Sequence, residues 1–188
     1  MLQECLELAV QAPTGRNRQR WDFIVVTDAG QRRALAEVYW RGLRDSEPQF
    51  VAHLPGANFT SARRGEHITD KIYEGVHYLI EHLHEVPALL IPCIHGRTER
   101  ASILEQANTW GSILPAVWSF MLAARERGLG TAWTILSPLC EREVVELLGI
   151  PYEEIMQVAL IPVASTIGTD FRPGPRVPLE QVVHWNWW

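Results

Sequence analysis

The sequence is poor in lysine and cysteine. Lys71 is the single lysine among 17 basic residues, and the 188 residues include three cysteines, Cys5, Cys93 and Cys140. An odd number of widely spaced cysteines fits neither a disulfide framework nor the ligand spacing of a zinc site. We therefore expect a reducing, cytoplasmic setting. The other basic residues are arginines, which suit phosphate recognition, although a compositional bias of the source genome explains the same count.

An excess of positive charge and long hydrophobic runs are also missing. The 22 acidic residues outnumber the 17 basic ones and give a net charge of -5, so no global positive field would attract nucleic acid. The longest apolar stretch, residues 113–124, contains Pro115 and Ser119 and is shorter than the ~20 residues that cross a bilayer. Glu4 and Glu7 lie where a signal peptide needs positive charge. We expect no nucleic-acid partner, no membrane span and no export.

The hydropathy pattern predicts one α+β domain over residues 1–188. Apolar residues at helical spacing predict helices at Leu2–Ala9, Gln31–Leu43, Glu66–Glu85, Ser102–Arg127 and Glu141–Leu148. Short apolar or β-branched runs predict strands at Trp21–Val26, Ala88–Ile94, Thr131–Leu136 and Met156–Val163. The Ala88–Ile94 run has no polar alternation, so we expect a strand covered on both faces. Ser102–Arg127 is expected to be the central buried helix.

Two segments differ from the rest of the chain. Residues 44–85 combine a stretch rich in proline, glycine and single aromatic residues with the Glu66–Glu85 helix, and long excursions of this kind often form lids. Residues 165–188 are rich in glycine and proline and end with Trp185, Trp187 and Trp188. Exposed apolar area is unfavourable by about 25 cal/mol per Å². We therefore expect 165–188 to form an arm that packs on a second subunit.

Several chemistries find little support in the residue pattern. His77 and Glu81 lie four residues apart and His82 and His84 two apart, and no HExxH-type pair exists, so we expect no metal site. The sequence contains no Gly-x-Ser-x-Gly elbow. Gly128-Leu129-Gly130 follows a predicted helix and precedes a predicted strand, which is the reverse of the order in a Rossmann phosphate loop.

The segment from Ala12 to Trp21 is the strongest candidate for a binding loop. It concentrates hydroxyl, amide and guanidinium donors after a helix end, and Gly15 permits close backbone approach. A planar polar ring with carbonyl oxygens and ring nitrogens would suit these donors. A well-hydrated turn capped by Asn17 explains the same residues equally well.

The order of motifs resembles that of the nitroreductase family of FMN-dependent oxidoreductases. An Ala-Pro-Ser/Thr-x-x-Asn-x-Gln-x-Trp-x-Phe segment matches Ala12–Phe23, and a Gly-Leu-Gly-Thr strand matches Gly128–Leu136. A Glu-Leu-Leu-Gly-Ile-Pro helix end matches Glu146–Pro151, and a basic Pro-Leu-Glu tail matches Arg176–Glu180. Each motif is weak alone, but together with the preceding helix they occur in the family's order over nearly the whole chain.

The resemblance implies a three-layer α+β fold with a central, mostly antiparallel sheet flanked by helices. It further implies an intertwined homodimer with FMN at the subunit interface, reduced by NAD(P)H and reoxidised by a small-molecule acceptor such as a nitroaromatic or quinone in a ping-pong mechanism. The matched positions imply three groups of cofactor-binding residues: the loop residues Pro13, Thr14, Gly15 and Asn17; the segment Trp133, Thr134, Ile135 and Leu136; and Arg176 for the FMN phosphate. No protein acid or base is implied for the hydride step, because the flavin supplies the chemistry.

One departure from the family pattern bears on flavin binding. Family members usually carry an Arg-Arg-Ser or Arg-Ser-x-Arg motif a couple of dozen residues before the Ala-Pro loop, and Met1 lies too late to include it. Either the start is truncated, or the phosphate is held by other residues such as Arg16, Arg18 or Arg172. A flavin-binding or flavin-sequestering dimer without turnover is therefore the alternative function, and an enzyme that consumes its own flavin is a third. Trp40, Phe50 and Phe59 are candidates to stack on an aromatic acceptor, although core packing explains them as well.

Overall fold

The computed structural model describes residues 1–46, 70–134, 140–171, 173–174 and 176–188, without the side chains of residues 46 and 70–73. The helices are α1 (Leu2–Ala9), α2 (Ala29–Ser46), α4 (Asp70–His82), α5 (Ile103–Glu126) and α6 (Glu141–Leu148), with short 3-10 turns at Gly15–Asn17 and Leu179–Gln181. The strands are β1 (Trp21–Val26), β2 (Ala88–His95), β3 (Leu129–Thr131), β4 (Ile155–Gln157) and β5 (Ile161–Ser165).

The five strands form one antiparallel sheet with β2 at its centre. The order is β1-β2-β5-β3, and β4 also pairs with β2. Every residue of β2 except the last, His95, is buried, which confirms the prediction of a strand covered on both faces. A strand without polar alternation requires such a position, because both of its side-chain rows need apolar neighbours.

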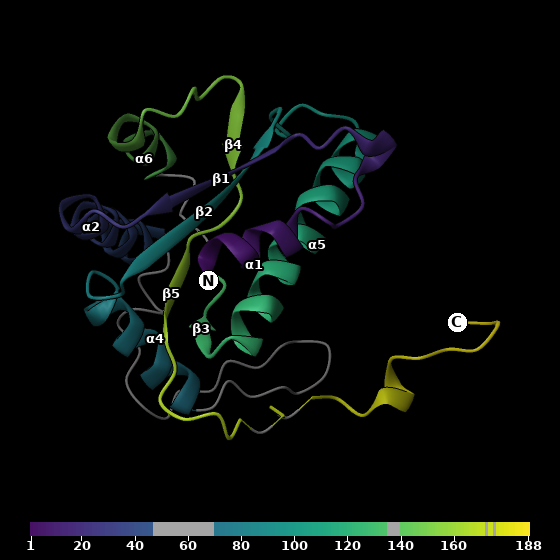
Figure 1. The fold of residues 1–188 in the computed structure, drawn as a ribbon. Coiled ribbons are helices and arrows are strands. Elements are labelled where there is room, and N and C mark those ends of the chain that lie inside the picture. Colours follow the sequence, from purple (N-terminus) through teal and green to yellow (C-terminus); the bar gives the residue numbers. More distant parts are fainter. Residues whose placement is uncertain (47–69, 135–139, 172, 175) are drawn as a thin grey trace.

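Helices cover both faces of the sheet and make three layers (Figure 1). Ala88, Leu90 and Ile94 of β2 pack with buried residues of α1 and α5. Leu89, Ile91 and Cys93, which alternate with them, pack with residues of α2, α4 and α6. Because successive side chains of a strand point to opposite faces, β2 supplies both hydrophobic cores. The predicted three-layer α+β fold is confirmed.

The prediction of one strand over Met156–Val163 is wrong, because a β-bulge divides this run. Gln157 pairs with Cys93, whereas Ile161 pairs with Leu90. Three residues, 158–160, therefore lie opposite two residues of β2, 91 and 92. This extra residue shifts the register by one. Residue 92 is a proline without an N–H, but its carbonyl accepts a hydrogen bond from Val158 N–H at 2.9 Å.

The strand predicted at Thr131–Leu136 lies earlier in the chain. Regular pairing covers Leu129–Thr131, after which Thr134 forms an isolated antiparallel bridge with Leu160. Gly130 lies so close to Thr166 that a Cβ at this position would be 3.1 Å from the Thr166 methyl group. The glycine within this strand therefore reflects a close approach of the neighbouring segment.

The helix boundaries follow local chemistry. A capping box of Ser102 and Glu105 begins α5, and Gly149, with a φ of 68°, ends α6. The described part of α2 continues to Ser46, so Arg44 belongs to this helix. The prediction that an irregular excursion begins at Arg44 is therefore wrong. Of the rest of the expected lid region, residues 47–69, with Phe50 and Phe59, lie outside the described residues, whereas residues 70–85 are described and contain α4.

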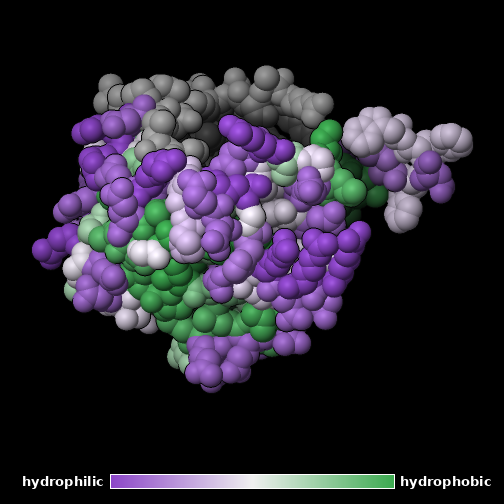
Figure 2. Space-filling view, turned by 90° about the horizontal axis from the view of Figure 1, so that it is seen from above, coloured by the Kyte–Doolittle hydropathy of each residue, from purple (hydrophilic) through white to green (hydrophobic). Residues whose placement is uncertain are grey.

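The segment after Ser165 contributes little to the two cores. Figure 1 shows it leaving the body beyond the sheet, and Trp185, Trp187 and Trp188 are 84–101% exposed. Figure 2 shows this segment projecting from the body, and it shows a continuous green area of hydrophobic residues on the body's surface. Among the described helices, none is long and apolar enough to cross a membrane.

Candidate functional site

The Pro13–Asn17 loop is organised by its own polar side chains. Thr14 Oγ1 accepts a hydrogen bond from Gln19 N–H at 3.1 Å, and the Thr14 carbonyl accepts one from Asn17 N–H at 2.9 Å. Asn17 Oδ1 accepts a further bond from Gln19 Nε2 at 3.0 Å. These contacts close the chain into the 3-10 turn between α1 and β1.

Three residues of this loop that are not glycine have left-handed backbone angles. Arg16, Asn17 and Gln19 have φ values of 57°, 53° and 49°. This conformation costs about 1–2 kcal/mol for an ordinary L-residue and less for asparagine. Such conformations persist only where the surroundings hold them, and they cluster at ligand-binding loops.

The loop is held against α5 by a buried hydroxyl. Gly15 N–H donates to Ser112 Oγ at 3.2 Å, and Ser112 Oγ donates to the Asn108 carbonyl at 2.6 Å. A Cβ at Gly15 would lie 3.1 Å from Asn108 Oδ1, so the glycine allows this close packing. Sequence reasoning missed Ser112. The sequence carried no signal for it, because its role depends on a contact with a residue far away in the chain.

The segment that follows β3 has a second buried hydroxyl. Thr134 is 8% exposed, exchanges backbone hydrogen bonds with Leu160 at 2.9 and 3.2 Å, and donates its hydroxyl to the Leu160 carbonyl. Burial raises the pKa of the neighbouring Tyr39 phenol above its ordinary value, and the hydrogen bond with the Thr134 side chain opposes this shift. Trp133 is 36% exposed. Ile135 and Leu136 lie outside the described residues.

The predicted site residues lie in three separate segments of the chain. The Pro13–Asn17 loop contacts the N-terminal half of α5 through Ser112, whereas Trp133 and Thr134 come after the C-terminal end of that helix (Figure 1). Arg176 is exposed in the C-terminal segment. Arg172 lies outside the described residues. No hydrogen bond joins the loop to Trp133 or Thr134 among the described residues.

The three cysteine thiols are not activated nucleophiles, and the described residues hold no cluster that could bind a metal ion. Burial raises the pKa of the Cys93 thiol to about 12 and moves the pKa values of Cys5 and Cys140 in the same direction. All three thiols are therefore protonated near neutral pH and weakly nucleophilic. Among the described histidines, cysteines and acidic residues, no group of three or more is arranged to hold a metal ion.

Comparisons with known proteins agree with this architecture. The sequence profile of the nitroreductase family matches residues 1–164. Iodotyrosine deiodinase from Thermotoga neapolitana is 28% identical over 178 residues, which cover 95% of this chain and 81% of that protein.

Two solved structures share the fold at low identity. A crystal structure of iodotyrosine deiodinase bound to FMN and 3-iodo-L-tyrosine has a TM-score of 0.66 at 22% identity, covering all of this chain and 87% of its own. A variant of the FMN- and NADPH-dependent nitroreductase NfnB from Sphigopyxis sp. strain HMH has a TM-score of 0.67 at 17% identity, covering all of this chain and 89% of its own. The motif order, the three-layer fold and the match over residues 1–164 lead to one conclusion: the chain belongs to the nitroreductase family.

Proposed function

We propose that the protein is an FMN-dependent oxidoreductase that takes a hydride from NAD(P)H and passes electrons to a nitroaromatic, quinone or similar acceptor. The observation that carries this proposal is the Pro13–Asn17 loop, which is held on α5 in a conformation typical of ligand-binding loops, in a member of the nitroreductase family. FMN supplies the two-electron chemistry when it is bound. The chain's task is to bind and orient the cofactor.

The donor set of the loop fits a phosphate-bearing cofactor. Arg16, Arg18 and Arg20 are exposed, and none of them forms an ion pair with any residue that the structure describes. Three such guanidinium groups in five residues create a local positive field on a chain of net charge -5. They can donate charge-assisted hydrogen bonds to a phosphate.

We assign the remaining cofactor contacts from the matched positions. Pro13, Thr14, Gly15 and Asn17 would contact the ring from one subunit. Trp133 and Thr134, with Ile135 and Leu136, would contact it from the other, and Arg176 would add a guanidinium for the phosphate. The hydroxyl of Thr134 is already bonded to Leu160, so its role is to fix the backbone of this segment.

An exposed apolar stripe on α5 favours a homodimer. Leu114, Trp118 and Leu122 lie four residues apart on α5 and are 39%, 57% and 53% exposed, so they form an apolar stripe along one side of the helix. Contiguous exposed apolar surface of this kind marks a protein interface. The exposed tryptophans of residues 165–188 provide further surface for a second subunit.

A two-fold axis near Trp118 would complete the site. If Trp118 of one chain lies opposite Trp118 of its partner in two antiparallel copies of α5, a residue before Trp118 faces a residue equally far after it in the partner. The turn near Ser112, six residues before Trp118, would then lie beside residue 124 of the partner. That arrangement brings the Pro13–Asn17 loop toward the partner's segment after α5. It uses the same stripe on both subunits, as two-fold symmetry requires.

Cross-linking tests this arrangement. Helix axes pack about 8–10 Å apart and Cα atoms lie about 2.3 Å from each axis, which leaves about 3.4–5.4 Å between facing Cα atoms. This range overlaps the Cα separations of disulfides. We expect Trp118→Cys to form a disulfide-linked dimer under mild oxidation, whereas Leu104→Cys, on the same helix but far from the axis, stays uncross-linked. Equal cross-linking of both variants contradicts the arrangement.

Flavin retention and turnover test the function. The purified protein is mixed with FMN, desalted and scanned across the visible flavin bands. Retained flavin supports the cofactor proposal, and Arg176→Ala should then reduce retention. Steady NADH or NADPH oxidation with a nitroaromatic or quinone, with ping-pong kinetics, supports the enzyme. Retained flavin without turnover supports the flavin-sequestering alternative, and sequential kinetics contradict a shared site for donor and acceptor.

Reductive dehalogenation of an aromatic substrate is a second candidate. It is favoured by the 28% identical iodotyrosine deiodinase, which aligns with 95% of this chain. The test is iodide release from 3-iodo-L-tyrosine by the FMN-loaded protein under chemical reduction. Iodide release in the absence of nitroaromatic reduction would replace the first candidate with this one.

A further inference from the structure

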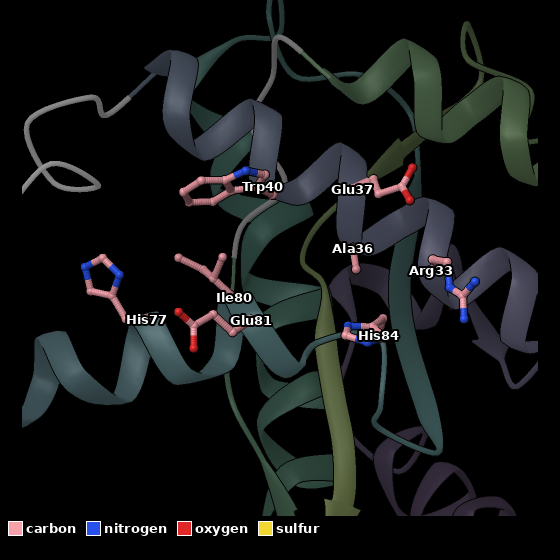
Figure 3. Close-up of a pocket in the computed structure, with 8 residues that line it drawn as sticks. All are labelled: Arg33, Ala36, Glu37, Trp40, His77, Ile80, Glu81 and His84. Carbon is pink, nitrogen blue, oxygen red and sulfur yellow. The ribbon is translucent and has the colours of Figure 1, made fainter.

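A cleft lies between α2 and α4 and is not used by the proposed flavin chemistry. It has a volume of about 440 Å³, within the 300–1,000 Å³ range of small-molecule sites. Figure 3 shows side chains of both helices surrounding it. Its lining residues are Arg33, Ala36, Glu37, Trp40, His77, Ile80, Glu81 and His84.

The cleft is separate from the flavin-binding loop. α2 and α4 pack against the side of the sheet that Leu89 and Ile91 face. The Pro13–Asn17 loop is held on α5, whose core residues pack with Leu90 and Ile94 on the other side. A ligand between α2 and α4 would therefore not occupy the position of that loop's ligand.

The lining combines an apolar floor with charged groups at two ends. Ala36 is buried, and Trp40 and Ile80 are half-buried beside it. In Figure 3, the Glu81 carboxylate lies at the end of the cleft near Trp40 and His77, and the Arg33 guanidinium lies at the other end near His84. The Glu37 carboxylate points away from the gap between the helices. An elongated ligand with one charged end fits this division.

Polar groups at this cleft have no partners among the residues that the structure describes. Glu81 and His77 form no ion pair or hydrogen bond there, and neither does Arg33. By contrast, Arg32 and Arg41 on the same helix donate hydrogen bonds to Val86 O and Glu143 respectively. His77 is half-buried and Glu81 and Arg33 are exposed at the rim of the cleft, so all three side chains are available to hydrogen-bond a ligand that lies on the apolar floor.

We propose that this cleft binds a small aromatic amine, with its ring on Ala36, Trp40 and Ile80 and its ammonium group beside Glu81. Two observations select a cation. The Glu81 carboxylate lies at the end of the cleft near Trp40, and the Arg33 guanidinium lies at the other end. The electron-rich face of a tryptophan attracts a cation in the same way as the carboxylate does. An aromatic carboxylate would place its negative charge beside Glu81 or lose contact with Trp40.

The test uses three ring compounds of matched size. 2-Phenylethylamine, 3-phenylpropanoate and 2-phenylethanol are titrated into the full-length protein, with and without FMN, and followed by calorimetry and ligand-observed NMR. We expect the amine to bind about tenfold more tightly than the alcohol, the effect of one charge-assisted hydrogen bond, and the carboxylate to bind most weakly. Equal binding of all three, tighter binding of the carboxylate, or no binding overturns the proposal.

Substitutions locate the binding. Glu81→Gln keeps the shape of an exposed side chain and should weaken amine binding about tenfold while leaving alcohol binding unchanged. Glu74→Gln on the same exposed helix surface does not alter the lining and should leave both affinities unchanged. Trp40→Leu should weaken the amine and the alcohol together. If Glu81→Gln and Glu74→Gln bind the amine equally, the ammonium position is wrong. A flavin-free preparation that still binds the amine shows that this site does not depend on the proposed flavin function.

Discussion

Replacing Ser112 by alanine should loosen the flavin-binding loop from the body of the protein. Ser112 is 9% exposed, and its Oγ accepts a hydrogen bond from the Gly15 N–H at 3.2 Å. Alanine leaves this half-buried N–H without its partner, which costs about 1–3 kcal/mol. The higher helix propensity of alanine offsets about 0.5 kcal/mol of this loss.

The net effect is a loss of about 1–2 kcal/mol in the free energy of unfolding. For a domain of this size, that corresponds to a fall of about 2–8 °C in melting temperature. The same loss also affects ligand binding if the bond holds Arg16, Asn17 and Gln19 in their left-handed conformations. FMN affinity should then decrease about five- to thirtyfold, measured by quenching of flavin fluorescence.

Ser119→Ala is the matched control on the same helix. Ser119 is half-buried, and its hydroxyl has no hydrogen-bond partner in the described part of the chain, so its replacement should change stability and FMN affinity little. The reasoning is refuted if Ser112→Ala and Ser119→Ala have the same melting temperature. Equal FMN affinities with unequal melting temperatures would show that Ser112 supports the fold but not the loop's binding conformation.

Three further predictions concern the scaffold. Burial raises the pKa of the Cys93 thiol from 9.0 to about 12, so the unfolded chain loses this proton at a lower pH than the folded chain does. The free energy of unfolding should therefore fall between pH 9 and 12. Urea titrations should show a smaller fall for Cys93→Ala. Arg97 forms a bidentate ion pair with Glu141 at 2.9 and 3.1 Å, and the two side chains are 16% and 15% exposed. Arg97→Lys should lower the free energy of unfolding by about 2 kcal/mol. An unchanged urea midpoint would contradict this prediction. Gly149→Ala should destabilise the protein by about 1 kcal/mol because the φ of Gly149 is 68°. Gly75, on α4, has open space around it, and Gly75→Ala should stabilise the protein by about 0.5–1 kcal/mol. Shifts of the melting temperature in the same direction for both variants would refute the backbone argument.

The elements with strong local signals were predictable from the sequence. The bounds of β1 and α6 agree with the predictions, because an apolar run ends at a turn in one case and Gly149 stops the helix in the other. The division of Met156–Val163 was not predictable. Both parts of that run are apolar, and the bulge depends on which residues of β2 lie opposite, a long-range property that the hydropathy pattern does not contain.

The candidate site was also only partly predictable from the sequence. Pro13–Asn17 could be found because it combines a helix end, a glycine and polar donors. Ser112 could not, because its role depends on a contact between residues 97 positions apart in the chain. A serine in an apolar helix has no fixed meaning until the partner of its hydroxyl is known.

The arrangement of α5 connects the stability of the fold to the proposed function. The N-terminal half of this helix holds the flavin-binding loop through Ser112, its end leads into the Trp133–Thr134 segment, and its middle exposes Trp118. A helix rises about 1.5 Å per residue, so the 14 residues from Ser112 to the last residue of α5, Glu126, span about 21 Å. This length separates the loop from the C-terminal end of α5, after which β3 leads the chain to the Trp133–Thr134 segment. If the two segments share one flavin across the proposed two-fold axis, a variant that separates the subunits should lose flavin even though every cofactor-binding residue is unchanged.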